Sequence, residues 1–411
     1  MKIVVCLLLA FVSSSCAKDE TLPPIVSSAG LAMDGSHFVP FSGAPDEFGQ
    51  SKSVDNSRVP GGWSTPPVAL PSGGFAIGSK AGQVFIFNDQ DSLARSFDVG
   101  DRVQIDQLLL DRSSIYAVSS IHTIYCVDTI GHTKWKARID TLITAPAVFA
   151  DGQIVVPTQN GLVALSAASG AIVWTYHTTN EMSSVALNAE AHQIVGATTS
   201  NDFEANDSIV ILSNAGKLLR MFPVAGRITS NIALCGKDKN SIAIGLARGS
   251  GNQKQIRGVL YDVVTGKLLQ EHTIPYFANS VGANSESYIT SGFRTSAGEL
   301  SSGIDAFSLS DTLTRWSRRF SEPVTAPLAV SDGSVYFALS FETSAIVGSK
   351  GLFYALDAGN GKTVLEHALS GALDGFVPGM PMPDRAGRLM LADRARPVIY
   401  LLNRTAFHRM F

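Results

Sequence analysis

Residue types that could support catalysis or bind a cofactor are few and widely spaced. The eight histidines show no metal-ligand spacing, and the chain has no Asp-x-Asp-x-Asp-Gly calcium loop and no Gly-x-Ser-x-Gly nucleophile elbow. Gly361-Lys362-Thr363 comes nearest to a phosphate-binding loop, but it stands between two strand-like runs, so we interpret it as a turn. We therefore predict no catalytic, cofactor or metal site, although acidic residues gathered in a channel would escape an argument from spacing.

Two cysteines, Cys126 and Cys235, lie in apolar runs typical of buried strands. We expect two buried free thiols there rather than a disulfide. Cys6 and Cys16 lie in or at the end of the apolar N-terminal run. The only thiol chemistry that the sequence suggests is therefore at that end of the chain.

The N-terminus carries an export signal. Lys2 precedes the apolar run Ile3 to Val12, and three serines separate this run from Cys16. The arrangement resembles a bacterial lipoprotein signal, which predicts a signal peptide over residues 1–15 and acylation of Cys16. Ser13 departs from that pattern, which prefers an aliphatic residue three positions before the cysteine. Ordinary secretion with cleavage after Ala17 is the alternative.

Composition narrows the classes of partner. The chain has 411 residues, of which 45% are hydrophobic and 16% charged, with a formal net charge of -3. Such a chain is long enough and apolar enough to bury a large core, and it lacks the basic excess of nucleic-acid-binding proteins. The N-terminal run is the only apolar stretch that approaches membrane length, and it is short for a span. We predict no nucleic-acid partner and a membrane contact through the lipid anchor only.

Residues 16–62 differ from the rest of the chain. They contain Pro23-Pro24, Gly43-Ala44-Pro45 and Pro60-Gly61-Gly62, which interrupt regular elements. We predict a flexible lipid-anchored tether over residues 16–62 and a folded domain over residues 63–411. The apolar cluster of Phe38, Val39 and Phe41 is an exception, because it could add an extra strand to the domain.

The folded domain repeats one unit of four short β-rich runs joined by turns such as Asp-Gly, Ser-Gly and Asn-Gly. Eight copies, spaced by 38 to 49 residues, are marked by their third runs, which are Val84–Asn88, Ile124–Asp128, Val163–Ser166, Val210–Ser213, Val259–Asp262, Ile304–Ser308, Tyr354–Asp357 and Ile399–Asn403. A four-stranded unit of this length predicts an all-β, eight-bladed β-propeller with four antiparallel strands per blade. Seven blades are the alternative. The last copy has four runs of its own, ending in 406–411, so the ring could close without a borrowed strand.

The turns and closing residues of these copies resemble the quinoprotein-like (PQQ-like repeat) propeller family. Its unit runs from an apolar strand ending in Ala-Leu-Asp, through a Thr-Gly-Lys turn, to a strand closing in Trp. The residues that fit include Ala355-Leu356-Asp357 with Gly361-Lys362, Thr265-Gly266-Lys267, Gly170 with Trp174, Gly216-Lys217, Trp135 and Trp316. The resemblance covers about residues 63–411. It says more about the fold than about the function, because we expect these tryptophans to pack between blades.

The enzymes of that family bind pyrroloquinoline quinone beside adjacent cysteines and a calcium ion. This chain has no adjacent cysteines, so we expect no cofactor. Length, signal and export are similar to the propeller lipoproteins of the outer-membrane β-barrel assembly machinery. That resemblance implies a noncatalytic scaffold for protein partners of the cell envelope, anchored in the outer membrane and facing the periplasm. An exported quinone-dependent oxidoreductase, and a cell-surface or secreted adhesin or glycan-binding propeller, remain the alternatives.

The connections between the second and third runs are uneven. They are short in the first three copies and long in the next four, over Thr198–Asp207, Ala247–Arg257, Phe293–Ser302 and Phe341–Lys350. In a propeller these connections emerge on one face, so four adjacent blades would carry a raised crescent. Aromatic and Arg side chains are enriched at interface hot spots, and these connections contain Phe203, Phe293, Arg294 and Phe341, together with the apolar set Ala345, Ile346 and Val347. We predict that these residues contact a protein partner; folding back onto their own blades is the alternative.

Overall fold

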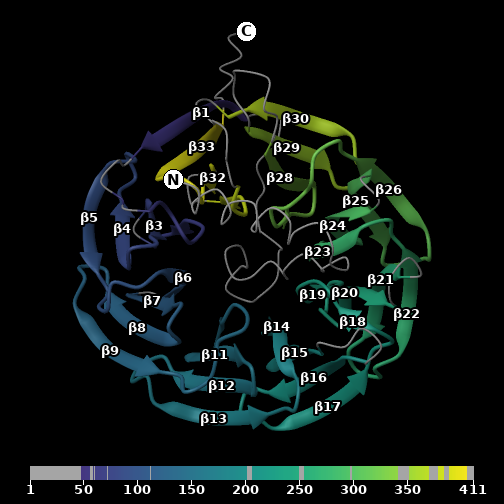
Figure 1. Ribbon diagram of the computed structural model, residues 1–411, viewed down its shortest axis with the longest axis horizontal. Helices are drawn as coiled ribbons and strands as arrows, with labels where there is room; N and C mark the ends of the chain where they lie inside the picture. Colours follow the sequence, from purple (N-terminus) through teal and green to yellow (C-terminus); the bar gives the residue numbers. More distant parts are fainter. Residues whose placement is uncertain are drawn as a thin grey trace, which may run out of the picture.

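The computed structural model is a ring of eight four-stranded antiparallel sheets around a central axis (Figure 1). It describes residues 48–55, 59, 61–71, 73–111, 113–200, 206–249, 254–296, 299–340, 351–369, 378–383 and 388–404. Within these residues every regular element is a strand, and one sheet has a fifth short strand. The eight-bladed prediction is confirmed, and the seven-bladed alternative is wrong.

The first four blades follow one another along the chain, each running from an inner strand to an outer one. Their strands are β2 Val68–Ala69, β3 Phe75–Gly78, β4 Gln83–Phe87 and β5 Leu93–Asp98; β6 Ile105–Asp111, β7 Ser114–Ser119, β8 Thr123–Asp128 and β9 Thr133–Arg138; β10 Val148–Ala150, β11 Gln153–Thr158, β12 Gly161–Ser166 and β13 Ile172–His177; and β14 Glu181–Asn188, β15 Gln193–Thr199, β16 Ser208–Ser213 and β17 Leu218–Pro223.

The next three blades continue in the same order. Their strands are β18 Arg227–Ile228, β19 Ala233–Cys235, β20 Ser241–Arg248, β21 Gln255–Asp262 and β22 Leu268–Thr273; β23 Phe277–Ala283, β24 Ser287–Ser296, β25 Glu299–Ser308 and β26 Thr314–Arg319; and β27 Ala329–Val330, β28 Ser334–Ser340, β29 Gly351–Asp357 and β30 Thr363–Ala368.

The eighth blade joins the two ends of the chain. Its strands β31 Met382–Pro383, β32 Leu389–Ala392 and β33 Val398–Arg404 come from the C-terminal part, and its outer strand is β1, Phe48–Asp55 (Figure 1). β1 pairs with β33 from Phe48 opposite Arg404 to Asp55 opposite Val398. The ring therefore does close with a borrowed strand, so the expectation that the last copy supplies all four of its own is wrong.

This closure also moves the start of the folded domain. β1 lies inside the range 16–62 that was predicted as a tether. Its sequence, FGQSKSVD, has few apolar residues, so the hydrophobic pattern did not mark it as a strand. An outer strand has less apolar surface to bury, so hydrophobicity marks it poorly. The Phe38 cluster, the signal and residues 406–411 lie outside the described residues.

The middle strands are buried on both faces because each blade packs between two others. All six residues of β7 are buried, as are five of the six in β12. Apolar clusters fill all eight blade-to-blade interfaces, and the cluster between the first and eighth blades contains Trp63, Phe75 and Leu401. Cys126 and Cys235 are buried and free, as expected.

The tryptophans of the outer strands bind the next blade. Trp135 Nε1 donates to the Ala167 carbonyl at 3.0 Å, and Trp316 Nε1 donates to that of Ala358 at 2.8 Å. The indole of Trp316 also lies against Gly361, where a Cβ would stand 2.5 Å from its Cδ2. These contacts confirm the expectation that the tryptophans pack between blades.

The inner strands are joined by side chains that bond to the backbone of the next blade. Gln107 donates from Nε2 to the Ala147 carbonyl and accepts the Ala147 N–H at Oε1, both at 2.8 Å. Asn231 bonds to both backbone groups of Val281 in the same way, at 2.8 and 2.9 Å. Buried backbone groups need such partners, so these two amides help fix the position of neighbouring blades.

Removing β1 should weaken the ring. A chain beginning at residue 56 lacks the outer strand of the eighth blade, whereas a chain beginning at residue 48 keeps it. We expect the shorter chain to lose about 3 kcal/mol or more of unfolding free energy, because a whole row of backbone hydrogen bonds to β33 is lost. Urea unfolding of both chains measures the difference. Equal midpoints would show that β1 does not close the ring.

Gly361 tests the contact between blades. Its φ of +69° and its approach to Trp316 both exclude a side chain, so Gly361→Ala should cost about 2 kcal/mol or more. Gly333→Ala is the matched control in the same blade, because nothing lies within 4 Å of its Cβ position. Thermal unfolding distinguishes the variants. An unchanged melting temperature for Gly361→Ala would contradict the packing described here.

Candidate functional site

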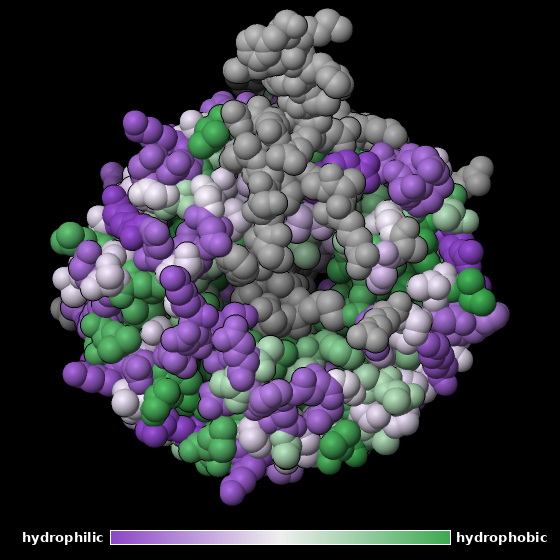
Figure 2. Space-filling view, turned by 180° about the vertical axis from the view of Figure 1, so that it is seen from behind, coloured by the Kyte–Doolittle hydropathy of each residue, from purple (hydrophilic) through white to green (hydrophobic). Residues whose placement is uncertain are grey.

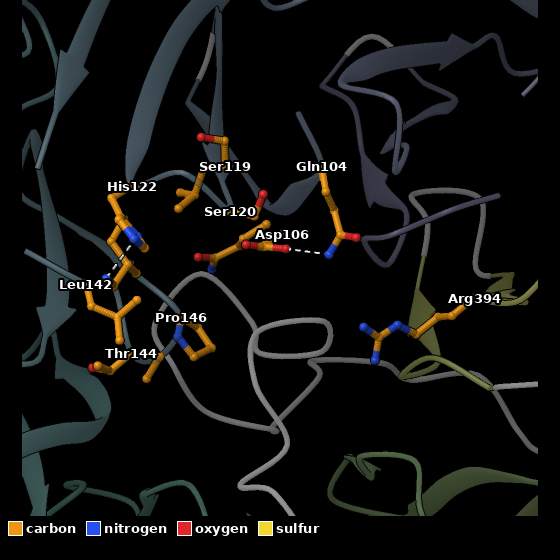
Figure 3. Close-up of a pocket in the computed structure, with 13 residues that line it drawn as sticks. Gln104, Asp106, Ser119, Ser120, His122, Leu142, Thr144, Pro146 and Arg394 are labelled. Carbon is orange, nitrogen blue, oxygen red and sulfur yellow. Dashed lines mark hydrogen bonds between the residues drawn. The ribbon is translucent and has the colours of Figure 1, made fainter. Parts of the chain in front are cut away.

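One face of the ring carries the connections between second and third strands, together with those that lead from each outer strand to the next blade. On this face the second blade forms a pocket of about 220 Å³ with neighbouring connections (Figure 3). The lining includes polar groups from separate blades, namely Gln104, Asp106, Ser119, Ser120, His122, Thr144 and Arg394. These side chains come together because connections from several blades reach the same side of the ring.

Asp106 and Arg394 are the charged groups of the pocket. Gln104 Nε2 donates to Asp106 Oδ1 at 2.7 Å, and burial raises the pKa of Asp106 despite this hydrogen bond and the charge of Arg394. Arg394 follows β32 in the eighth blade and points toward the pocket from the opposite side (Figure 3). Burial lowers its pKa, while Asp106 acts in the opposite direction. Among the described residues, its buried Nε has no hydrogen-bond partner.

A side chain just before the third strand has a structural role in two blades, and one inside the third strand does the same in the sixth blade. His122 Nδ1 accepts the Ile143 N–H at 3.3 Å, Asp207 Oδ2 accepts the Ile228 N–H at 2.6 Å, and Ser302 Oγ accepts the Val324 N–H at 2.9 Å. Each bond joins a blade to the chain entering the next one. His122 therefore borders the pocket while also fixing the segment that forms its wall.

Asp207 is a fully buried carboxyl group on this face. Its side chain accepts N–H groups of Ser200 and Ile228, both at 2.6 Å. Burial raises its pKa to about 6, although both N–H donors and the charge of Arg227 act to lower it. Since both oxygens are used in joining two blades, we interpret Asp207 as a structural group.

The pocket can bind a polar ligand group, because it offers a carboxyl group and a guanidinium on opposite sides. Within the described part of the chain, no group of three or more His, Cys, Asp or Glu side chains is placed to hold a metal ion. The described residues also contain no helix long and apolar enough to cross a membrane.

Two of the residues predicted to contact a partner lie within the described structure. Phe293 and Arg294 are half-buried and belong to β24, where they face Ser302 and Ser301 of β25. The run Phe293–Ser302 is therefore not a loop. It is the end of a long hairpin whose strands pair as far as Ser296 and Glu299. The prediction that this run is a loop was wrong, because its serines and glycines weaken the sequence pattern of a strand. Phe203, Phe341, Ala345, Ile346, Val347 and Cys16 lie outside the described residues.

The sequence did not reveal the pocket, because its polar residues are scattered over three blades and each is unremarkable in its own repeat. A weak signal existed in the polar residue before the third strand, as at His122 and Asp207. The sequence gave no signal for Arg394, because only ring closure places the eighth blade beside the first.

The eight blades define a quinoprotein-like β-propeller. Three solved structures share this fold. BamB from Moraxella catarrhalis is 16% identical, with 85% of this chain and 98% of that chain covered and a TM-score of 0.56, and the computationally designed Ika8 protein is 15% identical, with 84% of this chain and 98% of that chain covered and a TM-score of 0.60. A europium-containing methanol dehydrogenase is 10% identical, with 93% of this chain and 90% of that chain covered and a TM-score of 0.62. At these identities the likeness concerns the fold alone.

Family models give the more specific result. Residues 80–261 and 123–366 match the family described as outer membrane protein assembly factor BamB. These overlapping matches cover more than half of the chain, and the protein belongs to this family. A search of curated protein sequences gave no match.

Asp207 predicts a pH dependence of stability. Its pKa is higher in the folded protein, about 6, than the ordinary 3.8, so between these pH values the folded state holds a proton that the unfolded chain releases. Its contribution to stability is therefore present at low pH and is lost as the pH rises through this window, by about 3 kcal/mol. Urea unfolding from pH 4 to 7 should show a flatter profile for Asp207→Asn than for the unchanged protein. Parallel profiles would contradict the raised pKa.

Proposed function

We propose that this protein is a noncatalytic scaffold of the outer membrane, facing the periplasm, that binds a protein partner of the cell envelope. Acylated Cys16 anchors it, and no cofactor takes part. The match of residues 80–366 to the outer membrane assembly family carries this proposal. The lipoprotein-like order of Lys2, an apolar run and Cys16 supports the anchor.

The partner-binding surface is the face that carries the long connections. The hairpin of β24 and β25 belongs to this face and extends past Phe293 to its tip, where Leu300 is 37% exposed beside Glu299. An exposed leucine at the end of a hairpin gives an apolar anchor, and Arg294 opposite Ser301 adds a side-chain type common at hot spots. The pocket of Asp106 and Arg394 lies on the same face and offers charged groups to a polar segment of the partner.

Capture of partners from detergent-solubilised envelope tests this surface. Leu300→Asp places a charge at the hairpin tip and should reduce recovery of the partner at least tenfold, because truncating a hot spot costs about 2 kcal/mol or more. Leu313→Asp is the matched control. Leu313 is 65% exposed in the turn at the other end of the same blade, so this change should leave recovery intact.

A second variant tests the crescent predicted from sequence. Phe203→Ala, Phe341→Ala and Ile346→Ala together should reduce recovery while the melting temperature stays unchanged. Equal recovery by the unchanged protein, Leu300→Asp and this triple variant would reject the surface. Capture of no envelope protein by the unchanged chain would reject the scaffold function.

A further inference from the structure

The first two residues of each outer strand occupy equivalent positions in seven blades. The first faces one of the last two residues of the third strand, as Ile172 faces Leu165, and the pairing then skips one residue before Trp174 faces Ala164. The same shift occurs in the other six blades that run in chain order. The skipped residue is a β-bulge, and it lies beside the turn at the outer rim.

These positions are apolar in three consecutive blades. They are Ile172 and Val173 in the third blade, Leu218 and Leu219 in the fourth, and Leu268 and Leu269 in the fifth, with exposures of 40% to 61%. The second blade has Thr133 and Lys134 there, and the sixth has Thr314 and Arg315. Polar side chains occupy the same positions in these two blades, so the fold does not require apolar side chains there. We call the six apolar residues the rim ridge.

Contacts between blades fix the three parts of the rim ridge relative to one another. Trp174 Nε1 donates to the Asn214 carbonyl at 3.0 Å, which fixes the fourth blade's turn beside the third blade's outer strand. Arg220 Nη1 donates to the Thr265 carbonyl at 3.3 Å and links the fourth blade to the fifth in the same way. Met221 and Val264, which are 57% and 60% exposed, extend the apolar surface. Apolar side chains among hydrophilic ones at the rim are seen in the space-filling view of one face (Figure 2).

The backbone at the rim ridge is poorly suited to pairing with a strand of another protein. Each outer strand has its bulge at the second position, at Val173, Leu219 and Leu269. Bulges twist an edge away from regular pairing and are a common protection against strand addition. One added strand would also cover only one blade, whereas the apolar surface crosses three. The geometry therefore favours a broad apolar partner over an extended peptide.

The charges at the rim ridge are mainly basic. Lys217 and Lys267 are exposed, each directly before an apolar pair, and Arg220 follows in the fourth blade. The acidic groups of these strands and turns are fewer, and each already has a partner. Asp262 accepts the N–H and hydroxyl of Thr265, and Glu271 forms an ion pair with Arg257. Exposed leucines beside lysines are typical of proteins that bind the surface of anionic membranes.

We propose that the rim ridge binds the surface of a membrane containing anionic phospholipid. The leucine, isoleucine and valine side chains enter the boundary between headgroups and acyl chains, while Lys217 and Lys267 contact phosphate groups. This surface is separate from the partner-binding face, since the ridge adjoins the turns at the opposite ends of the strands. The proposal does not depend on the proposed function, and it needs no acyl chain.

Vesicle binding tests the rim ridge directly. The protein is the chain from Ala17 onward, which keeps every described strand and lacks the acylated cysteine. The probe is a vesicle of phosphatidylethanolamine with phosphatidylglycerol, compared with phosphatidylcholine alone. We expect binding to the anionic vesicles that weakens with salt, and at least a tenfold loss of partitioning in Val173→Ser, Leu219→Ser and Leu269→Ser combined.

The control removes three exposed apolar residues from other blades. Ile130→Ser, Leu313→Ser and Val364→Ser together should change partitioning less than twofold; their exposures are 55%, 65% and 39%. Both triple variants should keep the melting temperature, because all six positions are exposed.

Three outcomes would overturn the proposal. One is no binding of the unchanged chain to anionic vesicles, and another is equal loss in both triple variants. The third is evidence that the ridge makes protein contacts instead. In that case the ridge variant would lose self-association in sedimentation, or capture of an envelope protein, while its binding to vesicles persists. The Leu300→Asp experiment is independent of all three, so failure of the scaffold proposal is distinguishable from failure of this one.

Discussion

The whole structure depends on giving each blade a neighbour on both faces. The middle strands are apolar on both sides, and apolar clusters fill all eight interfaces, so a blade at an open end would expose one face to water. Closure by β1 removes that end. The pairing of β1 with β33 and the ion pair of Arg388 with Asp91, at 2.7 Å, both hold the eighth blade in place. Arg388 and Asp91 are 297 positions apart in sequence, so this part of the ring forms only when the chain ends meet.

Closure also determines where function can reside. Several buried polar groups join neighbouring blades, as Gln107, Asn231 and Asp207 do, so their role is structural. Side chains available to partners lie at the strand ends and on the outer rim. The pocket of Asp106 and Arg394 and the hairpin tip at Leu300 lie on one face, whereas the ridge of Leu219 lies at the rim beside the other. A rigid ring thus holds two surfaces of different chemistry in a fixed relation.

The sequence predicts the repeated parts well and the exceptions poorly. Third strands such as Gly161–Ser166 are apolar and recur at regular spacing, which gave the blade count. The tryptophans of three outer strands gave contacts between blades. β1 escaped because an outer strand buries little, and the hairpin at Phe293 escaped because serine and glycine interrupt its β pattern. The pocket could not be predicted, because Asp106 and Arg394 meet only through ring closure.

We propose that one rigid ring presents a protein-binding face and a separate membrane-binding rim. Photo-crosslinking in the intact envelope tests it most directly, with a light-activated residue in place of Leu300 in one protein and of Leu219 in another. We expect a protein adduct from position 300 and a phospholipid adduct from position 219. Phospholipid from position 300, or the same protein partner from both positions, would contradict it.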